Sequence, residues 1–509
     1  MRLSLILSQI SGIFRQSEND VSVTSENVNP KVVTFEDCVR INNARFKNEK
    51  IPQINSRNQY FAAITANILA LSVGISIGWT SPTIQILQST RSPLNYSITL
   101  QQASWIGSFL PLGALFGVLL FGWLSNVIGR FWALWIASFP QIFSWLCIIN
   151  ASTVEFLYIG RFTAGICTGA VFTLVPLYVS EISDNSARGF LGSIFLLTVN
   201  FGTLLMFIFG SYFSYSFTSK FMLSFPIVYA AIFMFFPETP YFLLQHGKTK
   251  KAENSLKFLN GCRKAVDTPD AIKIRLLVIA KKVEDQARSR TKSSFNEELK
   301  QKSPRKALII GIVLVMVNQL CGCFAFINYT ADIFEASGSS LSPNQSAIII
   351  AAIMVFGSGV SIWVIKRMTR KFLYSLSCAG TMIGLLLFGV YGTMRSYYDL
   401  ANFNWVSIVC MSFVIFIASA GLIPLTFIML SEILPPRIRS SGTTLCTALL
   451  WFIAFLLLRF FPLAVNVLQL HVCMYFFCSI TLLGMIFVIF FVPETKNRST
   501  EAIEKMLMN

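Results

Sequence analysis

The sequence has few charged residues and almost no histidine. Of its 509 residues only 13% are charged, 24 are acidic, and two, His246 and His471, are histidines. It contains no glycine-rich phosphate loop, no His-Glu-x-x-His zinc motif and no Ser-His-Asp set. The side chains from which most active sites are built are therefore scarce. We expect no enzymatic activity, no cofactor and no metal site.

The eleven cysteines do not form a metal-binding pattern, because they are scattered and most lie in apolar segments. Cys321 and Cys323 are close in sequence, but residues i and i+2 point to different sides of a helix. No histidine or acid accompanies them, as a zinc site would require. We expect both to be packing residues.

Long apolar segments are what the sequence has in excess. Hydrophobic residues make up 54% of the chain, with a mean hydropathy of +0.62, which is too apolar for one water-soluble core. The segments are about 20 residues long, enough to cross ~30 Å of hydrocarbon. They are continuously apolar, unlike the alternating strands of membrane β-barrels. The sequence predicts an all-α integral membrane protein with twelve transmembrane helices. They lie near residues 59–80, 102–124, 131–150, 154–179, 190–212, 220–237, 306–334, 346–365, 372–392, 404–430, 441–465 and 471–492.

The net charge of +17 orients the chain in the membrane. Counted over alternate loops, one set together with both terminal segments holds 36 of the 41 lysines and arginines. Cytoplasmic loops carry such an excess. We therefore expect a multi-pass protein of the plasma membrane, with both termini and the segment 245–306 in the cytosol. The basic surplus is placed to contact anionic lipid; nucleic acid is a much weaker alternative partner, and we expect none.

The chain contains an internal repeat about 251 residues apart. Val179-Ser180-Glu181-Ile182 precedes Arg188-Gly189, and Leu430-Ser431-Glu432-Ile433 precedes Arg439. Parallel repeats of this kind build two pseudo-symmetric six-helix halves around a central cavity. The predicted domains are a cytosolic tail (1–58), a first half (59–237), a central loop with short helices (238–305), a second half (306–492) and a cytosolic tail (493–509). The central loop is either a solvated linker with amphipathic helices or a regulatory segment.

Several motifs, in order, carry a family resemblance. They are Gly160-Arg161-Phe162-Thr163-Ala164-Gly165, Pro176-Leu177-Tyr178-Val179-Ser180-Glu181 with Arg188-Gly189, Pro237-Glu238-Thr239-Pro240 and Pro493-Glu494-Thr495-Lys496. They resemble the sugar porters of the major facilitator superfamily (MFS). Gly78-Trp79-Thr80-Ser81-Pro82 is similar to the insect branch of facilitated trehalose transporters. The resemblance spans about residues 60 to 500 and implies the MFS fold.

Charged residues at the cytosolic helix ends predict an inner gate. A carboxylate at membrane depth is costly unless it is paired. We expect acids of one half to meet guanidinium groups of the other when the cytosolic ends close. The alternative is helix capping and topology anchoring. The gate residues are Arg130, Glu181, Arg188, Glu238, Arg370, Glu432, Arg439 and Glu494.

Two cytosolic loops depart from the family pattern. In 122–130 Asn126 stands where an acid is usual, and in 366–371 Lys366 takes the acidic place. We expect both changes to weaken the cytosolic latch without changing the fold, which transport by Asn126→Asp and Lys366→Asp would test.

Glycine and proline predict close helix contacts and one bend. Gly113 in the second predicted helix and Gly165 with Gly169 in the fourth allow close approach of two helices. Gly421 and Pro424 break the hydrogen-bond ladder of the tenth. We favour a gating role for this bend, with simple packing as the alternative.

A sugar site needs amides for hydroxyls and an aromatic platform for C–H faces. By resemblance, Gln319 is a retained sugar contact, whereas Asn318 replaces a glutamine and Phe324 an asparagine. Phe427 stands in the place of a tryptophan, and Trp451 is kept. The pocket is thus more apolar than the family pattern, and each unpaired hydroxyl costs ~1–3 kcal/mol. Compensating polar residues are Asn200, Asn67 and Thr198, unless they only bond neighbouring helices. Tyr329 is a candidate outer lid.

The expected function is facilitated transport of a sugar, trehalose or a hexose, by alternating access. Proton-driven relatives carry a carboxylate in the first helix, but Tyr60 to Trp79 contains none. Because nothing there can take up a proton, we expect a uniporter. We also expect the protein to be a monomer. One alternative is a transporter of a less polar solute or a polyol on the same scaffold; the other is a non-transporting sensor. Asn95, in Asn95-Tyr96-Ser97 of the first external loop, is the candidate glycosylation site.

Overall fold

The computed structural model describes residues 57–90, 92–262, 270–290, 295–337, 341–399 and 401–508. The predicted N-terminal tail lies outside the described residues up to residue 56. The chain forms two compact units. We call Ala62–Phe236 with Ser289–Asn509 the bundle, and Met1–Phe61 with Pro237–Arg288 the linker unit.

The prediction of twelve membrane-spanning helices is confirmed. Twelve helical spans are long and apolar enough to cross a membrane, and the described residues contain no strand. The first half comprises α3 (Arg57–Gly78) with α4 (Thr80–Gln88), α5 (Leu100–Val127), α6 (Arg130–Ile149), α7 (Val154–Ile182), α8 (Asn185–Tyr212) and α9 (Tyr215–Phe233). The second comprises α14 (Lys302–Leu320) with α15 (Cys323–Asn328) and α16 (Thr330–Ser337), α17 (Pro343–Arg367), α18 (Arg370–Tyr397), α19 (Trp405–Ile417) with η2 (Ala418–Leu422) and α20 (Ile423–Ile433), α21 (Arg439–Leu468) and α22 (Leu470–Phe491).

The seventh span is broken, where the sequence predicts one helix over 306–334. Gly322 has φ +83°, a left-handed conformation that glycine adopts without strain. A Cβ there would lie 2.6 Å from the ring of Phe477, so no other residue fits. The break ends α14 and starts α15 in a new direction, directly after the predicted sugar contacts Asn318 and Gln319.

The tenth span carries the predicted irregularity. It changes to a π-helical turn, η2, which contains Gly421 and ends two residues before Pro424. The hydroxyl of Ser377 on α18 accepts from the Leu422 N–H and donates to the Ile417 carbonyl, both at 2.8 Å. A side chain of a neighbouring helix thus replaces the ladder bonds that the turn loses.

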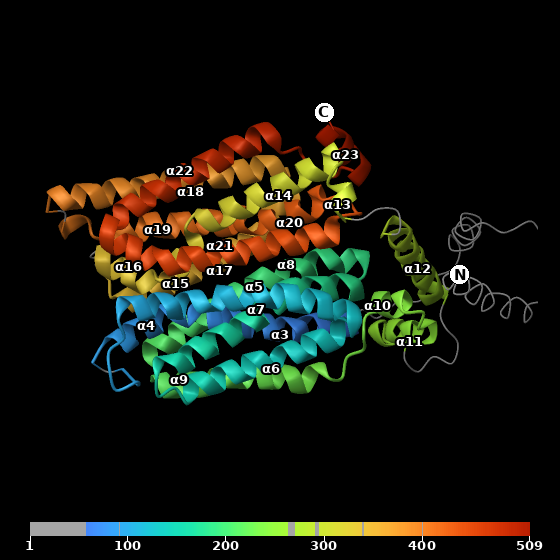
Figure 1. Ribbon diagram of the computed structural model, residues 1–509, viewed down its shortest axis with the longest axis horizontal. Coiled ribbons are helices and arrows are strands. Elements are labelled where there is room, and N and C mark those ends of the chain that lie inside the picture. Colours follow the sequence, from blue (N-terminus) through green and yellow to red (C-terminus); the bar gives the residue numbers. More distant parts are fainter. Residues whose placement is uncertain are drawn as a thin grey trace, which may run out of the picture. The chain divides into compact units, whose positions relative to one another are not determined.

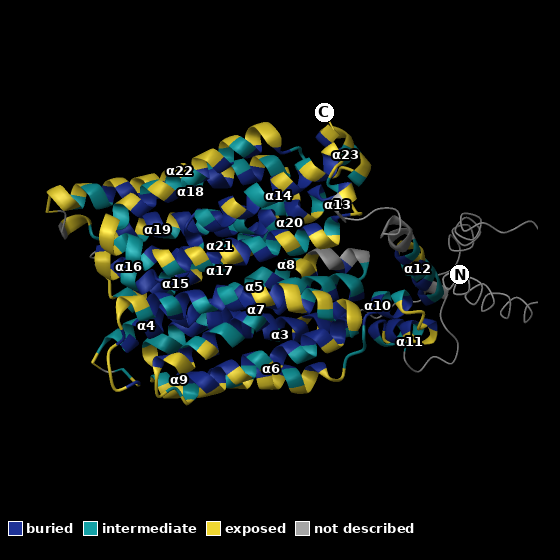
Figure 2. Ribbon diagram, in the orientation of Figure 1, coloured by how far each residue is buried: buried dark blue, intermediate teal, exposed yellow. Residues whose placement is uncertain are grey.

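The two halves of the bundle lie side by side, the first drawn blue to green and the second yellow to red in Figure 1. They meet where α5 packs on α21 and α8 on α17. Within the first half α5 and α7 approach closely: a Cβ on Gly113 would lie 2.0 Å from the Phe162 carbonyl, and one on Gly165 2.1 Å from that of Leu110. The predicted close contact is therefore present. Exposed residues occur along α6, α9, α18 and α22 (Figure 2).

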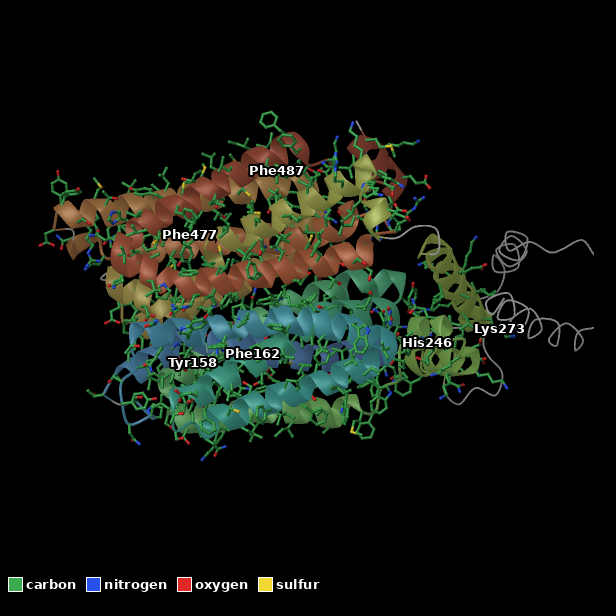
Figure 3. All side chains as sticks on the ribbon, in the orientation of Figure 1. Tyr158, Phe162, His246, Lys273, Phe477 and Phe487 are labelled. Carbon is green, nitrogen blue, oxygen red and sulfur yellow. The ribbon has the colours of Figure 1, made fainter. Side chains whose placement is uncertain are left out.

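The linker unit contains the short helices that the sequence predicts in the central segment. α10 (Pro240–Gln245), α11 (Thr249–Leu259) and α12 (Asp270–Arg290) share a small apolar core that includes Leu244, Leu256 and Leu276. The side chain of Gln59 on α3 donates to Asn260 at 3.0 Å. Figure 3 labels His246 at the end of α10 and Lys273 on α12. Two short helices, α13 (Phe295–Glu298) and α23 (Thr500–Met508), belong to the bundle.

Candidate functional site

An aromatic cluster lies where the two halves meet. The ring of Phe172 on α7 is 5.2 Å from Trp451 on α21, edge to face, and 6.2 Å from Phe427 on α20. Phe324 on α15 lies 5.9 Å from Trp451. The structure thus brings three predicted site residues together around Phe172, which the sequence analysis missed. Nothing in the sequence marks Phe172 among 47 phenylalanines.

Two polar atoms of predicted sugar-site residues are buried without hydrogen-bond partners among the described residues. They are Oε1 of Gln319 and Nε1 of Trp451. The two residues are 4% and 2% exposed, respectively. A buried polar group without a partner is costly. The amide therefore offers an acceptor and the indole a donor to a solute or water in this region.

The other predicted amides are engaged with neighbouring helices. Nδ2 of Asn318 donates to Oγ1 of Thr426 at 3.1 Å. Nδ2 of Asn200 donates to Oγ of Ser358 at 2.5 Å, a contact from α8 to α17 that joins the halves. Asn67 and Thr198 bond carbonyls of their own helices. For these residues the structure therefore shows the alternative role of helix-to-helix or intrahelical bonding.

Arg161 on α7 is a buried charge that the sequence analysis counted but assigned no role. Its guanidinium donates to the carbonyls of Ile106 at 3.2 Å and Ser76 at 2.5 Å, and to Oγ1 of Thr80 at 2.7 Å. It also lies 5.4 Å from the centre of the Trp79 ring. A charge inside a span is by itself a functional-site signal, and it could have been read from the sequence.

We call the end of the bundle where α5, α7, α17 and α20 terminate the basic end, and the other end the opposite end. Side-chain contacts hold the two halves together at the opposite end. At the opposite end Arg459 donates to Ser104 at 2.6 Å and Gln85 to Glu335 at 3.3 Å. The Ala331 N–H donates to the Ser81 hydroxyl at 3.1 Å.

Tyr329, the predicted outer lid, is buried at this closed end. Its hydroxyl donates to the Leu458 carbonyl at 2.8 Å. A Cβ on Gly107 of the first half would lie only 2.4 Å from that hydroxyl. Tyr329 therefore fills the space between the halves that Gly107 leaves open.

At the basic end the first half contains a buried ion pair. Nε of Arg130 lies 3.2 Å from Oε1 of Glu181, and its Nη1 donates to the Ser125 carbonyl. The sequence predicts that Glu181 pairs with a guanidinium group of the other half. In the structure it pairs with Arg130, which belongs to the same half. α6 and α7 pack along their lengths, so this pair does not require approach of the second half. The side chain of Arg188 lies outside the described residues.

The second half has a corresponding pair, extended by the segment after α22. Nη2 of Arg370 lies 3.4 Å from Glu432, and Thr495 donates to the other oxygen of that carboxylate at 2.5 Å. This pair too is within one half. Arg439, a predicted gate residue, donates to the Leu434 carbonyl at 3.1 Å and so closes the turn before α21.

Glu494 and Lys496 complete the turn between α17 and α18. The Glu494 carboxylate accepts from the backbone N–H groups of Arg370 at 3.0 Å and Lys371 at 3.1 Å. Nζ of Lys496 donates to the carbonyls of Lys366, Arg367 and Met368 at 2.9–3.0 Å. Burial raises the pKa of Glu494, but backbone donors from Lys496, Arg370 and Lys371 hold it below the ordinary value. An anion thus caps one helix start and a cation the preceding helix end.

The last two predicted residues lie elsewhere. Glu238 belongs to the linker unit, where its carboxylate accepts from the Thr239 N–H at 2.8 Å. Asn95 is exposed in the loop after α4, with φ +60°.

Comparison with known proteins gives the family. The family described as "Sugar (and other) transporter" matches residues 62–507. The chain belongs to this family. It is 31% identical over 450 residues to the "Facilitated trehalose transporter Tret1" of Bombyx mori, covering 88% of this chain and 86% of that protein. The protein of the same name from Aedes aegypti is 31% identical over 453 residues; the match covers 88% of this chain but 55% of the Aedes protein.

Solved structures confirm the fold of this sugar transporter. The proton:xylose symporter XylE bound to 6-bromo-6-deoxy-D-glucose aligns with a TM-score of 0.73 at 20% identity, over 89% of this chain and all of that chain. XylE of E. coli in a partially occluded inward open conformation aligns with a TM-score of 0.71 at 18% identity, over 87% and 100%. The predicted MFS fold with two pseudo-symmetric halves is confirmed.

The spans of this transporter carry almost no acid. The carboxylates within the twelve spans are Glu155, Glu181 and Glu432, and each lies within two residues of a span end. Two further acids, Asp332 and Glu335, lie on α16, which continues the broken seventh span at the opposite end. The buried Arg161 faces the hydroxyl of Thr80 in the first span. Among the described residues the acids of the spans are therefore confined to the two ends of the bundle, and its middle offers aromatic faces, amides and hydroxyls.

Proposed function

We propose that this protein carries a sugar, trehalose or a hexose, down its gradient by alternating access. The observation that carries the proposal is the cluster of Phe172, Phe427 and Trp451 at the meeting of the halves. Among the described residues, Nε1 of Trp451 and Oε1 of the retained amide Gln319 are buried without partners. Sugar rings present C–H faces to aromatic rings and hydroxyls to amides. The names of the insect relatives support trehalose as the first candidate.

The basic end faces the cytosol in this proposal, because it carries the lysine and arginine excess. The protein lies in the plasma membrane as a monomer, with both termini cytosolic and Asn95 glycosylated outside. The contacts of Tyr329, Arg459 and Gln85 then hold the external side closed. On reversal these contacts break and the basic ends approach.

Closure of the cytosolic side uses the ionic groups of both halves. Arg130 with Glu181 and Arg370 with Glu432 form two matching pairs at the basic end. When the halves approach, each carboxylate can share guanidinium groups of the other half, which favours the outward-facing state. Arg188, Arg439 and Glu494 of the bundle belong to the same proposed network, and the gate role of Glu238 in the linker unit stays a prediction from the sequence.

Transport is not coupled to protons in this proposal. A proton-coupled carrier needs a group inside the span that binds and releases a proton. Among the described residues the acids within the spans lie at their ends, and Asp332 and Glu335 of α16 lie at the opposite end. Arg161 is stabilised by dipoles of carbonyls and a hydroxyl. The protein is accordingly a carrier and not an enzyme.

The test is counterflow in proteoliposomes with labelled trehalose, glucose and a panel of polyols, with and without a proton gradient. We expect saturable trehalose or hexose flux that the gradient does not change. Trp451→Ala should abolish it, and Phe490→Leu, on a side chain 75% exposed, should not. Flux of polyols or less polar solutes alone would favour the second candidate, which the phenylalanines at 324 and 427 support. Gradient-driven accumulation would refute uniport, and absence of any flux would refute transport.

A further inference from the structure

A cavity lies at the opposite end of the second half, and none of the aromatic-cluster residues lines it. Its volume is about 380 Å³. It is formed by the end of α16, the last turns of α18 and the junction of α21 with α22. Figure 3 labels Phe477 on α22, the helix whose first turn contributes His471 to the cavity wall. The proposed transport function uses no residue of this cavity.

The cavity wall includes Arg395, and one nitrogen of its guanidinium is left without a partner in the described part of the chain. Nη1 of Arg395 is buried and has no hydrogen-bond partner among the described residues. Cations are favourable at a helix end such as that of α18, which explains a basic residue there. It does not explain a buried nitrogen without an acceptor, because such a group loses its hydration without compensation.

The other lining residues have the chemistry of an anion site. No aspartate or glutamate lines the cavity, whereas Ser337, Tyr391 and Ser396 bring hydroxyls and His471 an imidazole. Guanidinium groups bind phosphate and carboxylate through charge-assisted hydrogen bonds. An oxyanion in the cavity would supply the kind of acceptor that Nη1 of Arg395 lacks among the described residues.

The surroundings place the cavity at the level of lipid headgroups. Tyr397, Tyr398 and Trp405, which follow Arg395 at the end of α18 and the start of α19, are all exposed, with Tyr397 80% exposed. Exposed tyrosine and tryptophan are typical of the membrane–water interface. Both a lipid phosphate and a dissolved anion can reach a site at this depth.

We propose that the cavity around Arg395 and His471 binds a phosphate or carboxylate group. The anion accepts from the guanidinium of Arg395 once that side chain turns Nη1 toward the cavity. It also accepts from the exposed hydroxyl of Ser396 once that hydroxyl turns from the Gly392 carbonyl. Because Ala336 and Ser337 of α16 also line the cavity, the bound anion joins the end of the broken seventh span to α18 and α22.

The experiment uses the full-length protein purified in detergent. Native mass spectrometry measures retention of phosphatidylglycerol against phosphatidylcholine, and a thermal-shift titration measures stabilisation by inorganic phosphate against chloride at constant ionic strength. Arg395→Gln removes the cation, and Arg395→Lys retains the charge. Lys220→Gln is the matched control, since Lys220 is an exposed cation at the same end of the other half.

We expect wild type and Lys220→Gln to bind at least one of the two probes, and Arg395→Gln to lose about tenfold in affinity for it. Arg395→Lys should keep part of that affinity. Preference for phosphatidylglycerol alone identifies a lipid headgroup, and stabilisation by phosphate alone identifies a dissolved anion. Equal binding by wild type and Arg395→Gln would overturn the proposal, as would the absence of binding of either probe to wild type.

A second variant tests the site if Arg395→Gln does not fold. Ser396 is exposed on the cavity wall and bonds only its own helix, so Ser396→Trp narrows the entrance without removing a buried group. It should lower anion binding about tenfold and leave sugar counterflow intact. Loss of counterflow with unchanged anion binding would contradict the inference while leaving the transport proposal standing.

Discussion

The guanidinium of Arg161 donates to the hydroxyl of Thr80 at 2.7 Å, inside the bundle, where no carboxylate faces it. Nε and Nη1 of Arg161 donate to the backbone carbonyls of Ile106 and Ser76. The buried charge is thus stabilised by these dipoles and by the face of the Trp79 ring, and removing an acceptor leaves a charged donor uncompensated. Thr80 supplies the one acceptor that a substitution can remove.

Thr80→Val should therefore destabilise the protein by about 1–3 kcal/mol, because it leaves a buried charged donor without a partner. Thr80→Ser keeps the hydroxyl and should cost less. The apparent melting temperature in detergent measures the difference. Equal melting of Thr80→Val and Thr80→Ser would show that the hydroxyl does not support Arg161.

The spans could be predicted from the sequence because apolar length is a local property of the chain. The breaks within them could be predicted only in part. Gly421 and Pro424 predict the irregular tenth span. The hydroxyl that stabilises it, as both donor and acceptor, belongs to Ser377 on the neighbouring helix α18. The break at Gly322 depends equally on the ring of Phe477, which lies distant in sequence.

The site was harder to predict than the fold, since it depends on which side chains meet. Resemblance placed Trp451, Phe427 and Phe324 in the predicted pocket. In the structure Phe324 lies beside Trp451, and Phe172 lies beside both Trp451 and Phe427. Phe172, which joins them, has no distinguishing sequence signal. Charge alone also could not tell whether Glu181 pairs within its own half or with the other.

Phe172→Leu should lower sugar transport at least tenfold, because Phe172 contacts both Trp451 and Phe427 and its loss opens the platform between the halves. Phe490→Leu removes a ring that is 75% exposed and should transport like wild type. Initial rates of counterflow in proteoliposomes, at matched reconstitution, compare the two. Wild-type flux in Phe172→Leu would remove the cluster from the substrate path.

Ser377→Ala should change the behaviour of the tenth span. The variant leaves the Leu422 N–H and the Ile417 carbonyl without their side-chain partner, and we expect a loss of about 1–3 kcal/mol in stability. Ser375→Ala is the matched control on the same helix, since the Ser375 hydroxyl is buried with no hydrogen-bond partner. Removing it should be neutral or stabilising. Melting of both variants at or above the wild-type temperature would contradict the role assigned to Ser377.

Gly107→Ala should weaken the closed opposite end. The added methyl group would lie 2.4 Å from the Tyr329 hydroxyl and must displace it from the Leu458 carbonyl. Loss of that bond costs about 1 kcal/mol, which changes the ratio of the two states about fivefold toward the state open at this end. Labelling of a cysteine introduced near Tyr329, in a background without the native cysteines, measures accessibility from that side. Tyr329→Phe should shift accessibility in the same direction, and a decrease in either variant would contradict the prediction.

Glu494 should make stability at the basic end depend on acid pH. Its carboxylate accepts the N–H groups that start α18, and these donors hold its pKa below the ordinary value of 4.5. A group with a lowered folded pKa contributes stability that is present above the unfolded pKa and is lost as the pH falls through the folded pKa. Wild type should therefore lose the stability contributed by the ionised carboxylate as the pH falls below about 4.5. Glu494→Gln lacks this contribution at every pH. The difference between the two melting temperatures should therefore shrink as the pH falls from about 7 toward about 3. Glu501→Gln, at an exposed acid on α23 for which we expect no such role, is the control. A constant difference between wild type and Glu494→Gln across this range would show that the ionised carboxylate does not cap α18.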